Sequence, residues 1–244
     1  MPVSRFILLL AALLFGANGL AAVSLTGTRL IFDGRYAEAS LEILNRGDHE
    51  VLIQAWLSAP ENVDGSPRAS GVDLPFVLTP HLARLEGHGK QALRILYQGE
   101  GMPQGVESLM HLYVLEIPRK IAGANQLSIA IRQRIHVFYR PPGLTEDPAQ
   151  TPQQLRWTRA NAALQVSNPT PFHAAIQDVR LDGVAASDYL LLAPGASHQI
   201  PVDTATPPTR LSFQALTDYG GLRSYCAQAA GDQFNITEDR QKDC

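Results

Sequence analysis

The sequence predicts an all-β protein made of two β-sandwich domains. Short segments of apolar or alternating residues recur along the chain at the spacing of sandwich strands. The 17 prolines and 19 glycines mark turns between these segments, and no long stretch has the 3.6-residue apolar period of a helix. A proline-rich stretch of low apolar content, residues 142–154, separates two groups of segments. We therefore expect two sandwiches joined by a linker.

Residues 1–21 are predicted to be a cleaved secretion signal. Arg5 supplies a positive charge, residues 6–15 are apolar, and Gly19-Leu20-Ala21 forms a small-x-small cleavage site. The apolar segment is shorter than the roughly 20 residues that span a bilayer. We therefore expect an exported protein that starts at Ala22 and does not insert into the membrane.

The first domain is predicted over residues 22–141. Seven segments qualify as strands because their apolar residues alternate or run together between turn signals such as Asp33-Gly34. In order they are residues 23–32, 37–45, 51–58, 76–79, 91–97, 109–117 and 127–139. Seven is the strand count of an immunoglobulin-like sandwich. Trp56, in the third segment, is expected in the core.

The second domain is predicted over residues 155–244. Its strand candidates are shorter and again β-patterned: residues 164–167, 174–181, 189–192, 199–202, 211–216 and 222–227. Cys226 and Cys244 are the two cysteines of the chain, and in an oxidising compartment they can form a disulfide worth about 3 kcal/mol. The alternative is two unpaired thiols in a frayed tail. Two cysteines are too few for a zinc site, so we expect no metal.

Residues 126–142, with the sequence QLSIAIRQRIHVFYRPP, form the most informative segment. Because side chains alternate along a strand, this one has an apolar face and a mostly basic face. The apolar face carries Leu127, Ile129, Ile131, Ile135 and Val137, and the other face carries Ser128, Ala130, Arg132, Arg134, His136 and Arg140. Such a strand can offer a pairing edge and an anion pocket, which favours binding over catalysis.

Charge and motifs argue against nucleic acid and against an enzyme. The net charge is −3 and becomes more negative when Arg5 is removed, so the chain has no global basic field. The sequence has no phosphate loop, dinucleotide fingerprint, nucleophile elbow or zinc-protease motif. Its seven histidines show no metal-ligand spacing. We therefore expect no catalytic residues and no cofactor.

Several strings together resemble the periplasmic pilus-assembly chaperones of chaperone–usher secretion systems. They are AVSLTGTRLIFDG at 22–34, LTPHLARLEGHGKQALRILY at 78–97, ESL…EIP at 107–118, FYRP at 138–141, NPTPFH at 168–173 and TDYGG at 217–221. The resemblance covers almost all of the mature chain. It implies two immunoglobulin-like domains in an L-shaped arrangement, and a periplasmic protein that binds pilus subunits without ATP, prevents their aggregation and delivers them to an outer-membrane usher.

The resemblance gives the strand at 126–142 a role. Family members lend an edge strand to a subunit whose own sheet lacks one, so Leu127, Ile129 and Ile131 would be the donor side chains. The alternative is that these residues face the core of their own domain, because the pattern is the same in both cases. A free chaperone of this kind can also cap its donor edge by forming a dimer.

The resemblance also implies a pocket for the C-terminal carboxylate of the subunit. Arg29 matches the first anchor residue, and a buried carboxylate needs such charge-assisted hydrogen bonds. The second anchor of the family is a lysine, but this chain has His136 there, and Arg134 two residues earlier can supply the charge instead. If His136 is the anchor, we expect binding of subunits to weaken between pH 6 and pH 8, because the imidazole loses its proton.

Glu107, Arg140 and Asp218 match an ion cluster that fixes the angle between the two domains of family members. The alternative is three separately solvated charges. The short, cysteine-free connection at 119–125 resembles the short-loop class of the family, which serves rod-like pili.

Two rival functions are weaker. A secreted β-rich adhesion or pilus structural subunit should have an incomplete sandwich or an N-terminal extension, and a hydrolase needs a catalytic set that the sequence does not provide.

Overall fold

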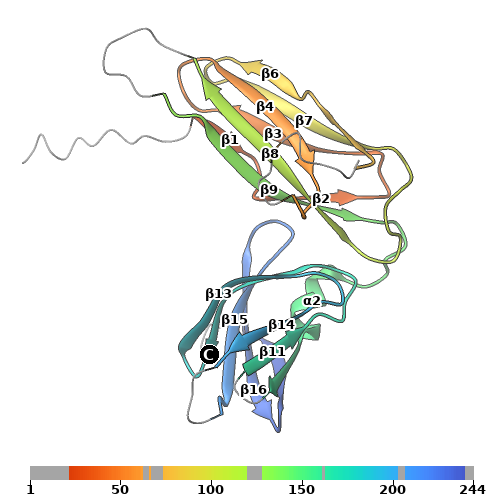
Figure 1. Cartoon of the computed structure of the whole chain (residues 1–244), viewed down its shortest axis with the longest axis vertical. Coiled ribbons are helices and arrows are strands. Elements are labelled where there is room, and N and C mark those ends of the chain that lie inside the picture. The colour runs from red at the N-terminus through yellow and green to blue at the C-terminus, as the bar shows by residue number, and fades with distance from the viewer. Residues whose placement is uncertain are drawn as a thin grey trace, which may run out of the picture.

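The structure is a computed structural model that describes residues 22–62, 66, 74–119, 128–160, 163–202 and 207–239. It is nearly all β and consists of two β units that meet at an angle, which gives the L shape seen in Figure 1. The predicted fold class is therefore confirmed. The signal segment 1–21, Leu127, Cys244 and most of the connection at 119–125 lie outside the described residues.

The first unit is a sandwich of two sheets. One contains β1 (Val23–Leu25), β3 (Glu38–Asn45), β7 (Lys90–Tyr97) and β5 (Phe76–Thr79), in that order. The other contains β2 (Arg29–Asp33), β9 (Ile131–Arg140), β8 (Ser108–Pro118), β4 (Val51–Ser58) and β6 (Leu82–Leu85). Strand β2 pairs with β9 in parallel. Alternate residues such as Phe32, Ile43, Leu93 and Met110 fill the space between the sheets and are fully buried.

Two expectations for this unit are wrong. The single strand expected at 23–32 is two strands, because the chain crosses at residues 26–28 from the four-stranded sheet to the five-stranded one. Trp56 is not in the core. Ile53 and Ala55 on β4 face the core, so Trp56, with the opposite parity, lies on the outer face and stacks on Tyr113 at 5.4 Å between ring centroids.

The second unit has one eight-stranded sheet. Its order is β13 (Val184–Leu192), β12 (Ala174–Leu181), β15 (Arg210–Leu216), β16 (Leu222–Ala230), β17 (Gln233–Glu238), β10 (Arg156–Ala160), β11 (Ala163–Ser167) and β14 (Ser197–Pro201). The sheet curls on itself, because Leu190 and Ile200 from its two outermost strands share one buried core with Trp157 and Phe213.

Some elements were not predicted. Strands β6, β10 and β17 have only four to six residues, and β10 and β17 contain just two apolar residues each, so their apolar signal is weak. Residues 142–154, predicted as a linker, contain the 3-10 helix η1 (Pro148–Gln150) and the helix α2 (Thr151–Gln154). The Asp147 carboxylate caps η1 by accepting a 2.9 Å hydrogen bond from the backbone N–H of Ala149.

Candidate functional site

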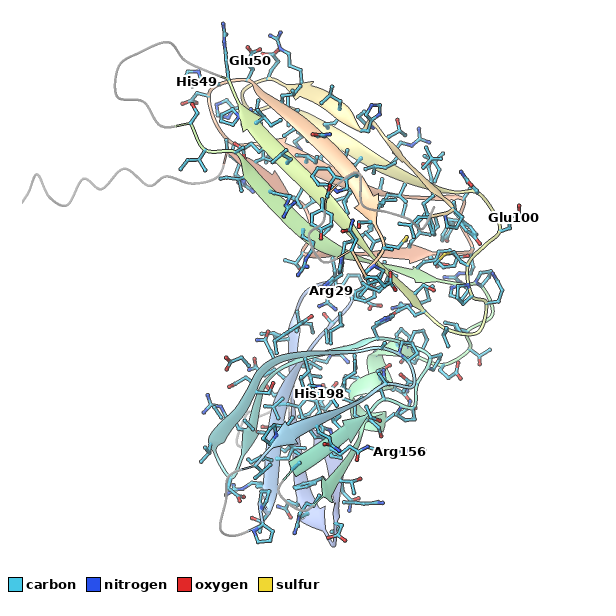
Figure 2. The ribbon with its side chains drawn as sticks, viewed as in Figure 1. Arg29, His49, Glu50, Glu100, Arg156 and His198 are labelled. Atoms are coloured by element: carbon cyan, nitrogen blue, oxygen red, sulfur yellow. The ribbon has the colours of Figure 1, made fainter. Side chains whose placement is uncertain are left out.

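A cavity of about 320 Å³ lies between the two units. The first unit contributes Arg29, Phe138 and Arg140 to its lining, and the second contributes His173 and Asp218. Figure 2 shows Arg29 at the junction of the units. The residues predicted to bind an anion and those predicted to fix the domain angle therefore share one cleft.

Strand pairing brings the predicted anchor residues into one row. In the parallel β2–β9 pair, Arg29 lies directly beside His136, and in the antiparallel β8–β9 pair His136 lies beside His111. The two imidazole rings are 5.3 Å apart between centroids. Arg134 lies two residues before His136 and is exposed. Because residues i and i+2 share a face, all four side chains project from the outer face of the five-stranded sheet.

Arg29 is suited to receive an anion. Its side chain is half-buried, its guanidinium carbon lies 5.7 Å from the Phe138 ring centroid, and its buried Nε has no hydrogen-bond partner. Burial lowers the pKa of Arg29. An arginine guanidinium nevertheless keeps its positive charge at neutral pH. A buried cationic donor without a partner is costly to leave unpaired, so a carboxylate that binds here gains a charge-assisted hydrogen bond.

His136 is neutral at physiological pH. Burial, followed by the neighbouring His111, Arg134, Arg29 and His173, lowers its pKa to about 4. The expectation that His136 loses a proton between pH 6 and pH 8 is therefore wrong for the free protein. The sequence could not reveal the size of this shift, because its largest cause is burial and because His111, Arg29 and His173 come near His136 only in the folded protein. A neutral imidazole still donates one hydrogen bond.

Glu107, Arg140 and Asp218 lie in direct contact across the junction. Arg140 Nε and Nη2 donate to Glu107 Oε2 at 2.9 and 2.7 Å, and Nη1 donates to Asp218 Oδ2 at 2.9 Å. The Glu107 side chain is 2% exposed and that of Arg140 is 18% exposed. The arrangement ties β8 and β9 of the first unit to the β15–β16 turn of the second.

His173 belongs to the same network and was not predicted. Its backbone N–H donates to Glu107 Oε1 at 2.8 Å, and its Nδ1 lies 2.9 Å from the same oxygen. The Phe138 ring packs against it at 5.2 Å between centroids. The histidine ends the string NPTPFH, but neither spacing nor charge relates it to Glu107, 66 residues away.

Half of β9 has an unpaired edge. Strand β2 pairs only with His136–Arg140, so within the described residues the 131–135 edge of β9 has a partner strand on the β8 side alone. Ile135 and Val137 belong to the core of the first unit, whereas Ile131 is half-buried and lies outside that core. Ile129 is 61% exposed. The apolar face of this segment therefore passes from core into solvent toward residue 129.

The remaining predictions concern the disulfide, metal ions and the membrane. Cys226 lies on β16 and is disulfide-bonded, while Cys244 lies outside the described residues, so the pairing stays a prediction. In the described part of the chain, no group of three or more histidine, cysteine or acidic side chains is placed to hold a metal ion. Among the same residues, no helix is long and apolar enough to cross a membrane.

Comparison with known proteins covers most of the chain. The profile of the PapD N-terminal domain, of pili and flagellar-assembly chaperones, matches residues 22–145, and that of the C-terminal domain of the pili assembly chaperone PapD matches residues 150–227. The chaperone protein FimB/FhaD of Bordetella pertussis is 34% identical over 223 residues, which cover 86% of this chain and 89% of that protein.

Solved structures agree. A chain in the complex of the Salmonella enterica SafA pilin with the SafB chaperone has a TM-score of 0.75 at 25% identity, covering 87% of this chain and 99% of that one. The CupB2 chaperone of Pseudomonas aeruginosa has a TM-score of 0.71 at 28% identity, covering 85% of this chain and 100% of that one.

Proposed function

The chain belongs to the PapD family of pilus-assembly chaperones, and from this premise we propose that it binds pilus subunits through the open 131–135 edge of β9. As a member of this family it is a chaperone and not an enzyme, and the family is periplasmic. The observation that carries the proposal is that this open edge continues directly into the row of Arg29 and His136. A single extended segment of a partner can therefore pair with the edge and reach the cations with its terminus.

The anchor in this proposal is Arg29, assisted by His136 and Arg134. Arg29 brings a buried donor without a partner, which a C-terminal carboxylate satisfies. His136 donates as a neutral imidazole, and the exposed Arg134 supplies the positive charge that it lacks. Fixing the terminus fixes the register, because a one-residue slip moves every side chain to the other face.

The donor side chains in this proposal are Ile129 and Ile131, together with Leu127 outside the described residues. Ile129 and Ile131 do not fill the core of their own domain, which supports a role in filling the groove of a bound pilus subunit. Covering that groove and pairing its edge prevents aggregation through exposed apolar strands. When no pilus subunit is bound, the same edge can pair with a second copy of the chain and form a self-capped dimer.

We also propose how the protein is exported, how it delivers its subunit and how its two domains are held. Cleavage after Ala21 releases the mature chain into the periplasm, and the bound pilus subunit is handed to an outer-membrane usher. The domains comprise residues 22–141 and 155–244, with residues 142–154 joining them, and the Arg140 cluster sets their angle. The disulfide joins Cys226 to Cys244.

Co-expression with the pilus subunits encoded by the same organism tests the anchor. The wild-type protein should copurify with subunits, and Arg29→Ala should lose them, because the carboxylate then loses its buried charged donor. Arg84→Ala is the matched control, since Arg84 on β6 has a 66% exposed side chain and lies outside the cleft lining.

The outcomes separate the parts of the proposal. A stable complex with Arg29→Ala at wild-type yield removes the anchor from the mechanism. If the wild type copurifies with none of the pilus subunits, binding through β9 is itself refuted. Circular dichroism of each variant establishes that loss of binding is not loss of folding.

A further inference from the structure

A glutamate is buried at one end of the first sandwich. Glu116 on β8 is 5% exposed and shares the inward parity of Leu112 and Val114, which belong to the core. Its neighbours on the two adjacent strands are Ile53 on β4 and Ile131 on β9. The carboxylate therefore lies between the two sheets, largely withdrawn from the water that would otherwise stabilise its charge.

The hydrogen bond of this carboxylate crosses to the other sheet. Glu116 Oε2 accepts from the backbone N–H of Val23 on β1 at 3.1 Å, and Gln133 on β9 donates to the carbonyl of Val23 at 2.9 Å. Among the residues that the structure describes, no cationic side chain forms an ion pair with Glu116. A buried carboxylate with only a neutral donor is costly, because a buried charge needs a charged partner.

A cation can form one residue away from this hydrogen bond. Consecutive backbone nitrogens are at most about 3.6 Å apart, so the nitrogen of Ala22 lies within about 7 Å of Glu116 Oε2. Ala22 is held in place, because its carbonyl accepts a 2.5 Å hydrogen bond from the backbone N–H of Arg46. In the precursor its nitrogen is an uncharged amide. Hydrolysis of the Ala21–Ala22 peptide bond by a signal peptidase, with one water molecule, converts this amide into an α-ammonium group, and the new carboxylate leaves with the signal segment. A free terminus can turn about the Cα–C bond of Ala22 toward Glu116 while the carbonyl keeps its partner.

We propose that Glu116 is the binding site of the α-ammonium group of Ala22, which removal of the signal segment creates. This inference is independent of subunit binding and rests on the proposed cleavage after Ala21. The ammonium group satisfies the buried carboxylate with a charge-assisted hydrogen bond and fastens β1 of one sheet to β8 of the other. Cleavage therefore stabilises the first domain, and the precursor is less stable than the mature chain.

An insertion separates the ammonium group from the glutamate. Gly-Ser placed between Ala21 and Ala22 keeps the small-x-small cleavage site, so the exported chain starts two residues earlier and Ala22 retains an amide, as in the precursor. Both mature chains are purified from the periplasm, and N-terminal sequencing establishes where each begins. In urea unfolding, with Trp56 fluorescence reporting on the first domain, the insertion should raise the equilibrium constant of unfolding about ten-fold, the effect of one hydrogen bond between charged groups.

Glu116→Gln is the background that isolates the ion pair. A glutamine still accepts the hydrogen bond from Val23 but carries no charge, so the same insertion should now change the equilibrium constant of unfolding by less than about two-fold. Glu42→Gln is the matched control. The Glu42 side chain is 42% exposed, and in this background the insertion should keep its full effect.

Three results would overturn the inference. An equal effect of the insertion in the wild type and in Glu116→Gln would show that the inserted residues disturb β1 without breaking an ion pair. No effect in either background would show that Glu116 does not bind the terminus. A wild-type chain that begins at a residue other than Ala22 would remove the cation from its place. The anchor is tested separately by copurification with Arg29→Ala, so either idea can fail while the other stands.

Discussion

Replacing Arg140 by methionine removes the cation at the centre of the interdomain network while keeping an unbranched apolar side chain. The change leaves Glu107 as a carboxylate whose side chain is 2% exposed. Removing one partner of a buried ion pair costs about 3–5 kcal/mol. Glu107 Oε1 keeps its contacts with the backbone N–H and Nδ1 of His173, so we expect the lower end, a loss of about 3 kcal/mol.

Urea unfolding followed by tryptophan fluorescence measures this loss, since Trp56 reports on the first domain and Trp157 on the second. Arg94→Met is the matched control. Arg94 pairs with Glu38, but their side chains are 52% and 42% exposed, so its loss should cost no more than about 0.5 kcal/mol. Small-angle scattering should show a wider spread of domain angles for Arg140→Met alone.

A double-mutant cycle decides whether the energy belongs to the pair. Glu107→Gln combined with Arg140→Met should destabilise the protein by about 2 kcal/mol less than the sum of the single changes, because the double variant no longer leaves the buried charge of Glu107 unpaired. Equal losses for Arg140→Met and Arg94→Met, or additive effects in the cycle, would refute the assignment of a buried clamp.

Three further predictions concern the cleft and the donor edge. The pKa of His136 is lowered to about 4 in the folded state. The unfolded chain therefore binds a proton at this residue below about pH 6.5, whereas the folded state does so only near pH 4. The free energy of unfolding should therefore fall by about 1 kcal/mol from pH 7 to pH 5, a figure that allows for solvent screening of the half-buried ring. Urea unfolding of His136→Gln should show a smaller fall over the same range. Ile129→Asp should abolish copurification with pilus subunits at a loss of stability under about 0.5 kcal/mol, since Ile129 is 61% exposed; a large stability loss would place it in the core. Gly220→Ala should cost more than Gly231→Ala in thermal unfolding, because both have positive φ but a Cβ at Gly220 meets Thr28 Oγ1 at 2.8 Å, and equal costs would show that this contact is relieved.

Local pattern predicted much of the fold. The alternation in residues 174–181 and 51–58 predicted strands with the same bounds as β12 and β4. The pattern failed where strands are short and polar, as in β10, and where an uninterrupted run changes sheet, as at residues 26–28. A change of sheet leaves alternation almost intact, so only the pairing partners reveal it.

The candidate site was predicted only in part. Arg29, Glu107 and Arg140 came from a resemblance between strings, and the structure places all three on the lining of one cavity. His173 was missed, because its neighbour Glu107 is 66 residues away in the sequence and no spacing rule joins the two.

The sequence by itself determined that the chain folds into two β-sandwiches, and that the strand at 131–140 has an apolar face and a basic face. These properties are local, since alternation needs only the residues of one strand. Only the tertiary structure decided that β2 pairs in parallel with the last five residues of β9. That pairing leaves the 131–135 edge open and sets Arg29 beside His136. It also decided that His136 is neutral, because its pKa depends first on burial and then on neighbours such as His111, Arg29 and His173, which lie on other strands or in the second domain.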